Sequence, residues 1–358
     1  MSEKILVAMS GGVDSCMTAA LLQEAGCTLY GATMQLYCGE KDENVCGSSK
    51  DAADAAALAA HFGFSHEILE YTDAFNDAVI RRFAEGYARG ETPNPCIECN
   101  RYMKFSLLWE KAKEMGCDAI ATGHYARVEK DAVSGRFVLK KPRDISKDQT
   151  YVLYHLTQEQ LAHTRFPLGG YLKTEVRQMA EERGLVSASK PDSQDICFVP
   201  DGDYAAFLER YTGSAVPCGD FVDAQGRVLG KHKGHIHYTV GQRKGLGVSF
   251  GQPMFVLGKD AQSNKVILGA KEELPCTALL ADDVNWMAFE TLTAPIKVMA
   301  KTRYHQPETP ATVYPAENGI RVEFDRPKVA APGQAIVFYD GDVVLGGGTI
   351  RTLIRGEQ

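Results

Sequence analysis

The feature that most constrains the fold is a short loop with two glycines near the start of the chain. Residues 10–15, Ser-Gly-Gly-Val-Asp-Ser, follow the apolar run 4–9 and precede the helical pattern 16–22. A buried strand therefore turns through two glycines into a helix. Glycine lets the backbone approach an anion closely, and the N–H groups and dipole at a helix start favour negative charge. The pattern predicts a phosphate site, with an ordinary Gly-Gly turn as the alternative.

Hydroxyl and carboxylate side chains flank these glycines. Ser10 and Ser15 supply hydroxyl donors, and Asp14 is placed to hold Mg²⁺ or to orient the loop. No lysine follows the second glycine, which excludes the kinase-type loop whose lysine contacts the β- and γ-phosphates. The loop resembles the pyrophosphatase loop of the N-type ATP pyrophosphatases. That resemblance implies that ATP is split into AMP and pyrophosphate, and that AMP activates an oxygen.

Strand and helix patterns alternate through the first half of the chain. This alternation predicts an α/β fold with a doubly wound parallel sheet, of the adenine nucleotide alpha hydrolase kind, over residues 1–205. We expect one helix over 105–115 and a loop interruption over 187–195. Ligands bind such sheets beyond the carboxyl ends of the strands, so Met34 and Gly123 should converge on the glycine loop. Short alternating strands predict a β-rich central domain over 206–277 and a small C-terminal β-barrel over 278–358.

The net charge and the cysteine content limit the binding partners and the cellular compartment that we expect. The net charge of −7 argues against nonspecific coating of nucleic acid, because lysine and arginine supply most of that affinity. Residues 220–271, however, carry eight Lys and Arg against three Asp, so we expect an RNA-facing surface at 230–247 that includes His232, His235 and His237. Ten cysteines without a secretory leader indicate reduced thiols and a cytoplasmic protein. No apolar stretch approaches the ~18 residues of a membrane span.

Two cysteines lie in settings that suit sulfur chemistry. Residues 92–105, Thr-Pro-Asn-Pro-Cys-Ile-Glu-Cys-Asn-Arg-Tyr-Met-Lys-Phe, place Cys99 near a helix start between Pro95 and the basic residues Arg101 and Lys104. Both features favour the nucleophilic thiolate. The second is Cys197, just after the interruption at 187–195. The alternative for each is a buried, inert thiol.

Six ordered motifs resemble those of the tRNA-specific 2-thiouridylases along essentially the whole chain. They lie at residues 10–15, 92–105, 121–127, 146–151, 190–198 and 238–247. The resemblance implies a tRNA-uridine 2-sulfurtransferase. ATP adenylates the C2 oxygen of the wobble uridine in the anticodon loop, and sulfur then replaces that oxygen with release of AMP and pyrophosphate. It also implies a sulfur-relay protein or a cysteine desulfurase as the sulfur donor.

The same resemblance implies the site residues. The ATP-binding set is Ala8, Met9, Ser10, Gly11, Gly12, Val13, Asp14, Ser15, Met34 and Gly123. The set that meets tRNA or the target base is Asn94, Pro95, Cys96, His124, Lys147, Asp148, Gln149, Arg303, Tyr304 and Gln334. The catalytic pair is Cys99 and Cys197.

Two routes for sulfur stay open. In the first, Cys197 carries a persulfide, Cys99 attacks it, and a disulfide remains for reductants to reopen. In the second, Cys96 stands where the family pattern has an Asp, which leaves the general base unassigned and creates a C-x-x-C pair. With Cys197, this pair could hold a four-iron, four-sulfur cluster whose open iron binds sulfide. Cys38 and Cys46 receive no role.

Two other functions compete with thiolation. An adenylating ligase of the same superfamily would share the glycine loop but would have no use for the two cysteines and a β-rich RNA-facing half. A noncatalytic tRNA-binding protein could dispense with an intact loop and paired thiols.

Overall fold

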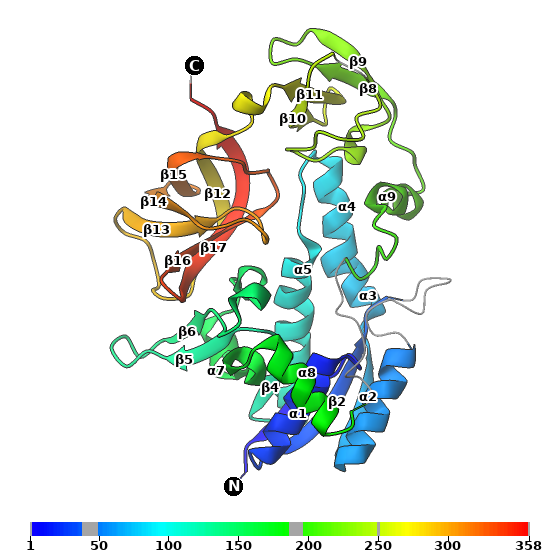
Figure 1. Ribbon diagram of the computed structural model, residues 1–358, viewed down its shortest axis with the longest axis vertical. Coiled ribbons are helices and arrows are strands. Elements are labelled where there is room, and N and C mark those ends of the chain that lie inside the picture. The colour runs from blue at the N-terminus through cyan, green and yellow to red at the C-terminus, as the bar shows by residue number, and fades with distance from the viewer. Residues whose placement is uncertain (1, 38–48, 186–195, 249–250, 357–358) are drawn as a thin grey trace.

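The computed structural model describes residues 2–37, 49–185, 196–248 and 251–356. Cys38, Cys46 and the predicted interruption at 187–195 lie outside these ranges. The chain forms, in order, a parallel-sheet domain, a central β domain and a C-terminal β-barrel (Figure 1). The predicted fold class is confirmed.

A five-stranded parallel sheet forms the first domain. Its order is β3-β2-β1-β4-β7, with strands β1 (Lys4–Ala8), β2 (Thr28–Gln35), β3 (Ser65–Glu70), β4 (Ala119–Ala121) and β7 (Thr164–Arg165). Successive side chains of a strand point to opposite faces. Ile5 and Val7 accordingly pack with α1 (Val13–Glu24) and α2 (Ser49–Phe62), whereas Leu6 packs toward α6 (Leu108–Glu114). The strand order reverses between β1 and β4, which is where such sheets bind ligands.

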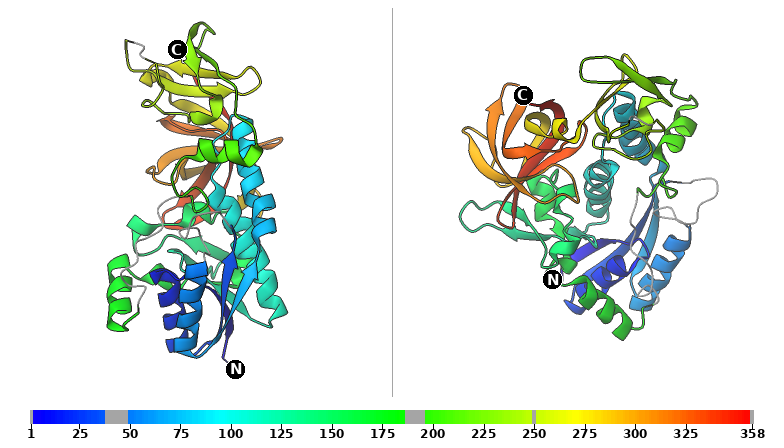
Figure 2. Two further views of the ribbon diagram at one scale, coloured as in Figure 1. Left: turned by 90° about the vertical axis from the view of Figure 1, so that its right-hand side faces the viewer. Right: turned by 45° about the horizontal axis from the view of Figure 1, so that its top comes forward.

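Two long, interrupted helices run from this sheet toward the other domains (Figures 1 and 2). The first consists of α3 (Thr72–Phe75), the π-helix η1 (Asn76–Ile80) and α4 (Arg81–Ala88). The second consists of α5 (Pro95–Glu98), the π-helix η2 (Cys99–Leu107) and α6. We expected this helix to begin at residue 105, and that start is wrong. Asn94 caps the helix and Pro95 occupies its first turn, where a missing N–H costs nothing.

Shorter helices complete the first domain and lead into the second. They are α7 (Gln158–Ala162), α8 (Lys173–Glu182) and α9 (Tyr204–Thr212), with 3-10 turns at Ile145–Lys147, Thr150–Val152, Pro167–Gly170, His235–His237 and Lys271–Glu273. Each described helix is too short or too polar to cross a membrane.

The central domain is a four-stranded sheet of order β10-β11-β8-β9. Its strands are β8 (Gly219–Val222), β9 (Val228–His232), β10 (Phe255–Asp260) and β11 (Lys265–Gly269). Phe221, Tyr238 and Val256 are at the centre of its small core.

The C-terminal domain is a six-stranded barrel. Its strands are β12 (Cys276–Trp286), β13 (Ile296–Lys301), β14 (Thr309–Ala316), β15 (Gly319–Lys328), β16 (Ala335–Asp340) and β17 (Val343–Ile354), and pairing of β12 with β17 closes it. The hairpin of β5 (Arg127–Lys130) and β6 (Phe137–Lys140), which belongs to the first domain in sequence, pairs with β17 through Lys140 and Val343. The first domain and the barrel therefore share a sheet.

Candidate active site

The glycine loop has the geometry of an anion site. Gly11 adopts a φ of +68°, and a Cβ there would lie 2.7 Å from the Asp51 carbonyl oxygen, so glycine is required. Ser15 Oγ accepts from the Ser10 N–H at 3.2 Å and donates to the Gly12 carbonyl at 3.0 Å. Gly12 is the N-cap of α1, so no capping side chain covers its first turn. The loop can therefore present backbone N–H groups and hydroxyls to a phosphate.

A buried lysine reaches the loop from a distant helix. Lys173 Nζ, at the start of α8, donates to both carboxylate oxygens of Asp14 at 2.7 Å, and the Tyr125 hydroxyl donates to Asp14 at 3.0 Å. The lysine missing from the loop itself is thus supplied by tertiary structure. The sequence carried no local signal for Lys173, which is the first residue of an ordinary amphipathic helix.

The other predicted ATP residues lie in the turn after β4, near the end of β2 and immediately next to the loop in sequence. A Cβ at Gly123 would lie 2.9 Å from the Asp14 backbone and Cβ atoms, so the turn after β4 touches the loop directly. Met34 is near the carboxyl end of β2, beside β1 in the sheet. Met9 and Val13 are buried, while Ala8 is half-buried.

The cysteine segment follows at the start of the second long helix. The Asn94 side chain accepts from the Cys96 N–H at 3.1 Å, which places Cys96 in the first helical turn, where it is exposed. Cys99 is buried and begins the π-helix η2. π-Helical turns within α-helices recur at functional sites.

Cys197 comes from a later part of the chain, near the start of the described range 196–248. It is half-buried and packs against the hydrophobic core to which Cys99 belongs. The next residue, Phe198, is almost fully buried, with its ring in contact with Phe75, Phe83 and Phe207. This aromatic cluster anchors the Cys197 backbone.

The described residues do not bring together the three thiolates that the predicted iron–sulfur cluster would need. Within residues 2–37, 49–185, 196–248 and 251–356, no three His, Cys, Asp or Glu side chains gather closely enough to hold a metal ion, so Cys96, Cys99 and Cys197 do not form a cluster site. Both oxygens of Asp14 accept hydrogen bonds from Lys173, and Oδ1 also accepts from Tyr125, so the second lone pair of Oδ2 could coordinate Mg²⁺.

His124 was expected to meet tRNA, but its ring is buried. It lies between Phe105 and Phe166 and shares a 2.7 Å hydrogen bond with the Thr122 hydroxyl. Burial, with a contribution from Lys104, holds the pKa of His124 well below its usual value. The ring is therefore neutral and would need a rearrangement to reach RNA.

The predicted contacts at 147–149 are partly engaged within the protein. Asp148 is buried and accepts from the Thr150 hydroxyl at 2.6 Å, while Gln149 Oε1 accepts from the Tyr125 N–H at 2.8 Å. Lys147 is half-buried at the end of a 3-10 turn. Gln149 thereby connects this segment to Tyr125, which contacts Asp14.

The barrel contributes residues beside the cysteine segment. Arg303 Nη2 donates to the Val240 carbonyl at 2.7 Å, and Gln334 Nε2 donates to the Thr92 carbonyl at 2.6 Å. Burial raises the pKa of Tyr304 to about 12, with smaller contributions from Asp148 and Cys96, so both of these groups lie within electrostatic range of Tyr304. Arg303 and Gln334 are in this state bonded to the protein itself.

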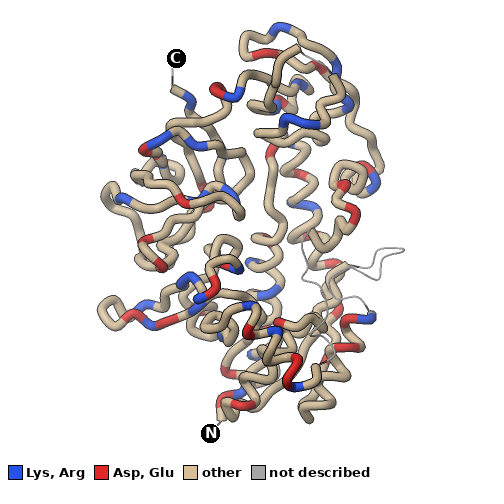
Figure 3. Tube along the Cα trace, in the orientation of Figure 1, with Lys and Arg blue, Asp and Glu red and all other residues tan. Residues whose placement is uncertain are grey.

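The basic stretch of the central domain is only partly as expected. Lys231, Lys233, Arg243 and Lys244 are exposed, and basic residues follow this part of the chain in Figure 3. Placing the histidines on the surface was wrong for His232 and His235, which are buried and hydrogen-bond to Asn264. The His232 ring contacts the rings of Phe221 and Tyr238, and burial lowers the pKa of His232. His237 is half-buried and 3.5 Å from Glu209.

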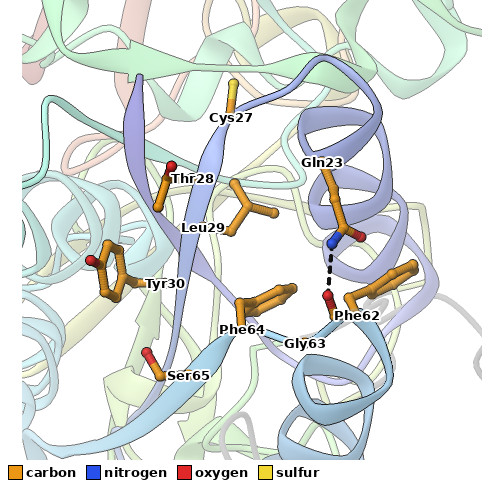
Figure 4. Close-up of a pocket in the computed structure, with 9 residues that line it drawn as sticks. All are labelled: Gln23, Cys27, Thr28, Leu29, Tyr30, Phe62, Gly63, Phe64 and Ser65. Carbon is orange, nitrogen blue, oxygen red and sulfur yellow. Dashed lines mark hydrogen bonds between the residues drawn. The ribbon is translucent and has the colours of Figure 1, made fainter. Parts of the chain in front are cut away.

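A cavity of about 350 Å³ lies at the opposite end of the parallel sheet (Figure 4). Cys27, Leu29 and Phe64 are among its lining residues, near the amino ends of β2 and β3. None of the predicted site residues lines it. The glycine loop, at the carboxyl end of β1, is therefore a separate site.

Comparison with known proteins matches all three domains. Family models match as tRNA methyl transferase HUP domain over residues 3–201, tRNA methyl transferase PRC-barrel domain over 205–270 and aminomethyltransferase beta-barrel domain over 276–350.

Curated relatives match the whole chain. The tRNA-specific 2-thiouridylase MnmA of Halothermothrix orenii is 49% identical over 98% of this chain and 99% of its own length. The protein of the same name from Acetivibrio thermocellus is 48% identical over the same shares. A solved 4-thiouridine synthetase–RNA complex with bound ATP is more distant, at 19% identity and a TM-score of 0.37 over 58% of this chain and 50% of that one.

Proposed function

The chain belongs to the family of tRNA-specific 2-thiouridylases, and from that premise we propose how its residues divide the reaction. The protein is an ATP-dependent tRNA sulfurtransferase. The observation that supports this assignment is that Lys173 and Gly123 meet the glycine loop at the sheet's switch point. Cys99 packs in the large hydrophobic core that also includes Leu6 of β1, and Cys197 packs against that core.

The first step is adenylation of the tRNA base. The C2 oxygen of the wobble uridine attacks the α-phosphorus of ATP, and pyrophosphate leaves. Backbone N–H groups at the start of α1 and the Lys173 ammonium neutralise charge that develops on the phosphates. Asp14 orients that ammonium through its two 2.7 Å contacts. The magnesium that accompanies ATP enters as part of the substrate.

The second step transfers sulfur. A donor protein of the relay or desulfurase type leaves a persulfide on Cys197. The Cys99 thiolate attacks the Cys197 sulfur, a Cys99–Cys197 disulfide forms, and hydrosulfide is released. Hydrosulfide adds to C2, and the C–O bond breaks with AMP as the leaving group. A dithiol reductant then supplies two electrons to reopen the disulfide.

The tRNA side of the reaction uses two surfaces. Exposed Lys231, Lys233, Arg243 and Lys244 supply phosphate contacts, which position an RNA without reading its sequence. Asn94, Pro95 and Cys96 border the pocket for the unstacked base, which an anticodon loop presents at little cost.

Single serine substitutions test the division of labour. Cys99→Ser and Cys197→Ser should each abolish thiolation while pyrophosphate release from ATP and tRNA continues. Cys96→Ser should retain most thiolation, because the two-thiol route has no role for a third sulfur. Iron in anaerobically purified protein, lost together with thiolation in Cys96→Ser, would instead establish the cluster route. Release of ADP and phosphate would refute the adenylation step.

A further inference from the structure

The segment that carries Cys96 and Cys99 is held by the C-terminal barrel at both of its ends. At the first end, the Thr92 N–H donates to the Pro332 carbonyl at 2.8 Å, and Gln334 donates to the Thr92 carbonyl at 2.6 Å. A Cβ at Gly333 would lie 2.7 Å from Glu91 Cβ and 2.9 Å from Thr92 N, so the two backbones touch.

Two arginines complete the attachment through a bulge in β12. Arg101, two residues after Cys99, donates to both carboxylate oxygens of Asp283, at 2.6 and 3.1 Å. Arg351 of β17 donates to Asp282 at 2.7 Å and to Glu91 at 3.1 Å. The planar two-point pair of Arg101 with Asp283 restricts orientation as well as distance.

The conformation of Asp283 indicates that the bulge is specialised. Its φ of +47° is in the left-handed region, which costs energy for a residue other than glycine. The pairing of β12 with β17 shifts register between Asp282 and Asn285, and bulges re-aim side chains in this way. The side chains of Arg101 and Asp283 are 30% and 40% exposed, so solvent screens the pair and its contribution to folding stability is small.

We propose that Asp283 is a positioning residue for sulfur transfer, which holds the Cys99 end of the π-helix against the barrel through Arg101. This inference rests on the proposed role of Cys99. The barrel then does more than contribute to an RNA surface, because it sets where the nucleophile stands relative to Cys197 and the adenylated base. Displacements of ~1 Å can reduce a positioned reaction by about 100-fold.

The test compares Asp283→Ala with a matched ion-pair variant elsewhere on the barrel. We expect Asp283→Ala to slow thiolation at saturating tRNA about 10-fold, with KM for tRNA and pyrophosphate release within about twofold of wild type. The alkylation rate of Cys99 by iodoacetamide, followed by peptide mass spectrometry, should change as well. Glu323→Ala removes the exposed 2.9 Å pair with Arg321, which is remote from residues 91–101 in sequence, and should change none of these.

A charge exchange tests whether the loss of activity in the single variants comes from the broken ion pair and not from misfolding. Arg101→Asp alone should behave like Asp283→Ala, and Arg101→Asp combined with Asp283→Arg should recover at least half of the lost rate. Wild-type thiolation by Asp283→Ala, or an equal loss of tRNA binding and thiolation, would overturn the proposal. Cys99→Ser separates the two hypotheses: if it still thiolates tRNA, the proposed function fails, and if it does not while Asp283→Ala is fully active, only the positioning role fails.

Discussion

Gly123→Ala offers a direct test of the phosphate site, because the turn after β4 touches the glycine loop. An added Cβ would lie 2.9 Å from the backbone carbon and Cβ of Asp14 and 3.1 Å from the Ser15 nitrogen. Ordinary contacts of a Cβ begin at 3.4 Å, so the loop must move by about 0.5 Å. The atoms in the way belong mostly to the backbone and cannot rotate aside.

Two effects follow from this displacement. Overpacking of this kind costs roughly 1–3 kcal/mol of stability, which urea unfolding would measure. The loop also carries Asp14, which orients Lys173, so we expect pyrophosphate release to fall about 10-fold or more. The binding of tRNA, measured without ATP, should remain within about twofold because the basic residues 231–244 are on another domain.

Gly170→Ala is the matched control. It lies at the end of a 3-10 turn shortly before α8, and an added Cβ there meets no described atom within 4 Å. This substitution should leave stability and pyrophosphate release essentially unchanged. Pyrophosphate release by Gly123→Ala at the wild-type rate would refute the argument that Gly123 sets the position of the loop.

Three further outcomes are expected. Lys173→Met should lower the rate of pyrophosphate release and raise KM for ATP, with partial recovery in Lys173→Arg, and an unchanged KM and rate would show that the lysine only neutralises Asp14. The pair Arg243→Ala and Lys244→Ala should reduce the salt dependence of tRNA binding by about 1.8 in log–log slope if each residue neutralises one phosphate, measured by titration at several salt concentrations. Burial lowers the pKa of His155 to about 4, so the unfolded chain binds protons more readily, and the free energy of unfolding should fall as pH drops from about 6.5 toward 4. His155→Gln should lose less unfolding free energy over this pH range, as measured by urea titrations at several pH values. The same pH dependence in wild type and His155→Gln would contradict this prediction.

The turn from strand to helix through the glycine loop was predictable from sequence because its signal is local. A buried strand, two glycines and a helix start are contiguous, and each has its own backbone requirement. The same holds for the alternation that predicts the parallel sheet. The barrel was likewise visible as short alternating strands, confirmed by the closure of β12 on β17.

Predictions from local sequence patterns were wrong where contacts between residues distant in the chain determine the structure. The helix expected from residue 105 begins at Pro95, because Asn94 caps it and a π-helical stretch carries it through Cys99. His232 and His235 have the composition of a basic surface, but they face Asn264 and the core of the central domain. Composition cannot tell which face of a strand or turn is covered.

The sequence by itself determined the fold class, the glycine loop between β1 and α1, and the family, since each can be recognised from short segments of contiguous residues. Only the tertiary structure brought Lys173 to Asp14, 159 residues away, and Arg101 to Asp283, 182 residues away. It also joined β6 of the first domain to β17 of the barrel. The identity of a charged residue does not specify its ion-pair partner, because any opposite charge attracts it. Only the packing of the whole chain fixes the distance and the solvent exposure that select one partner.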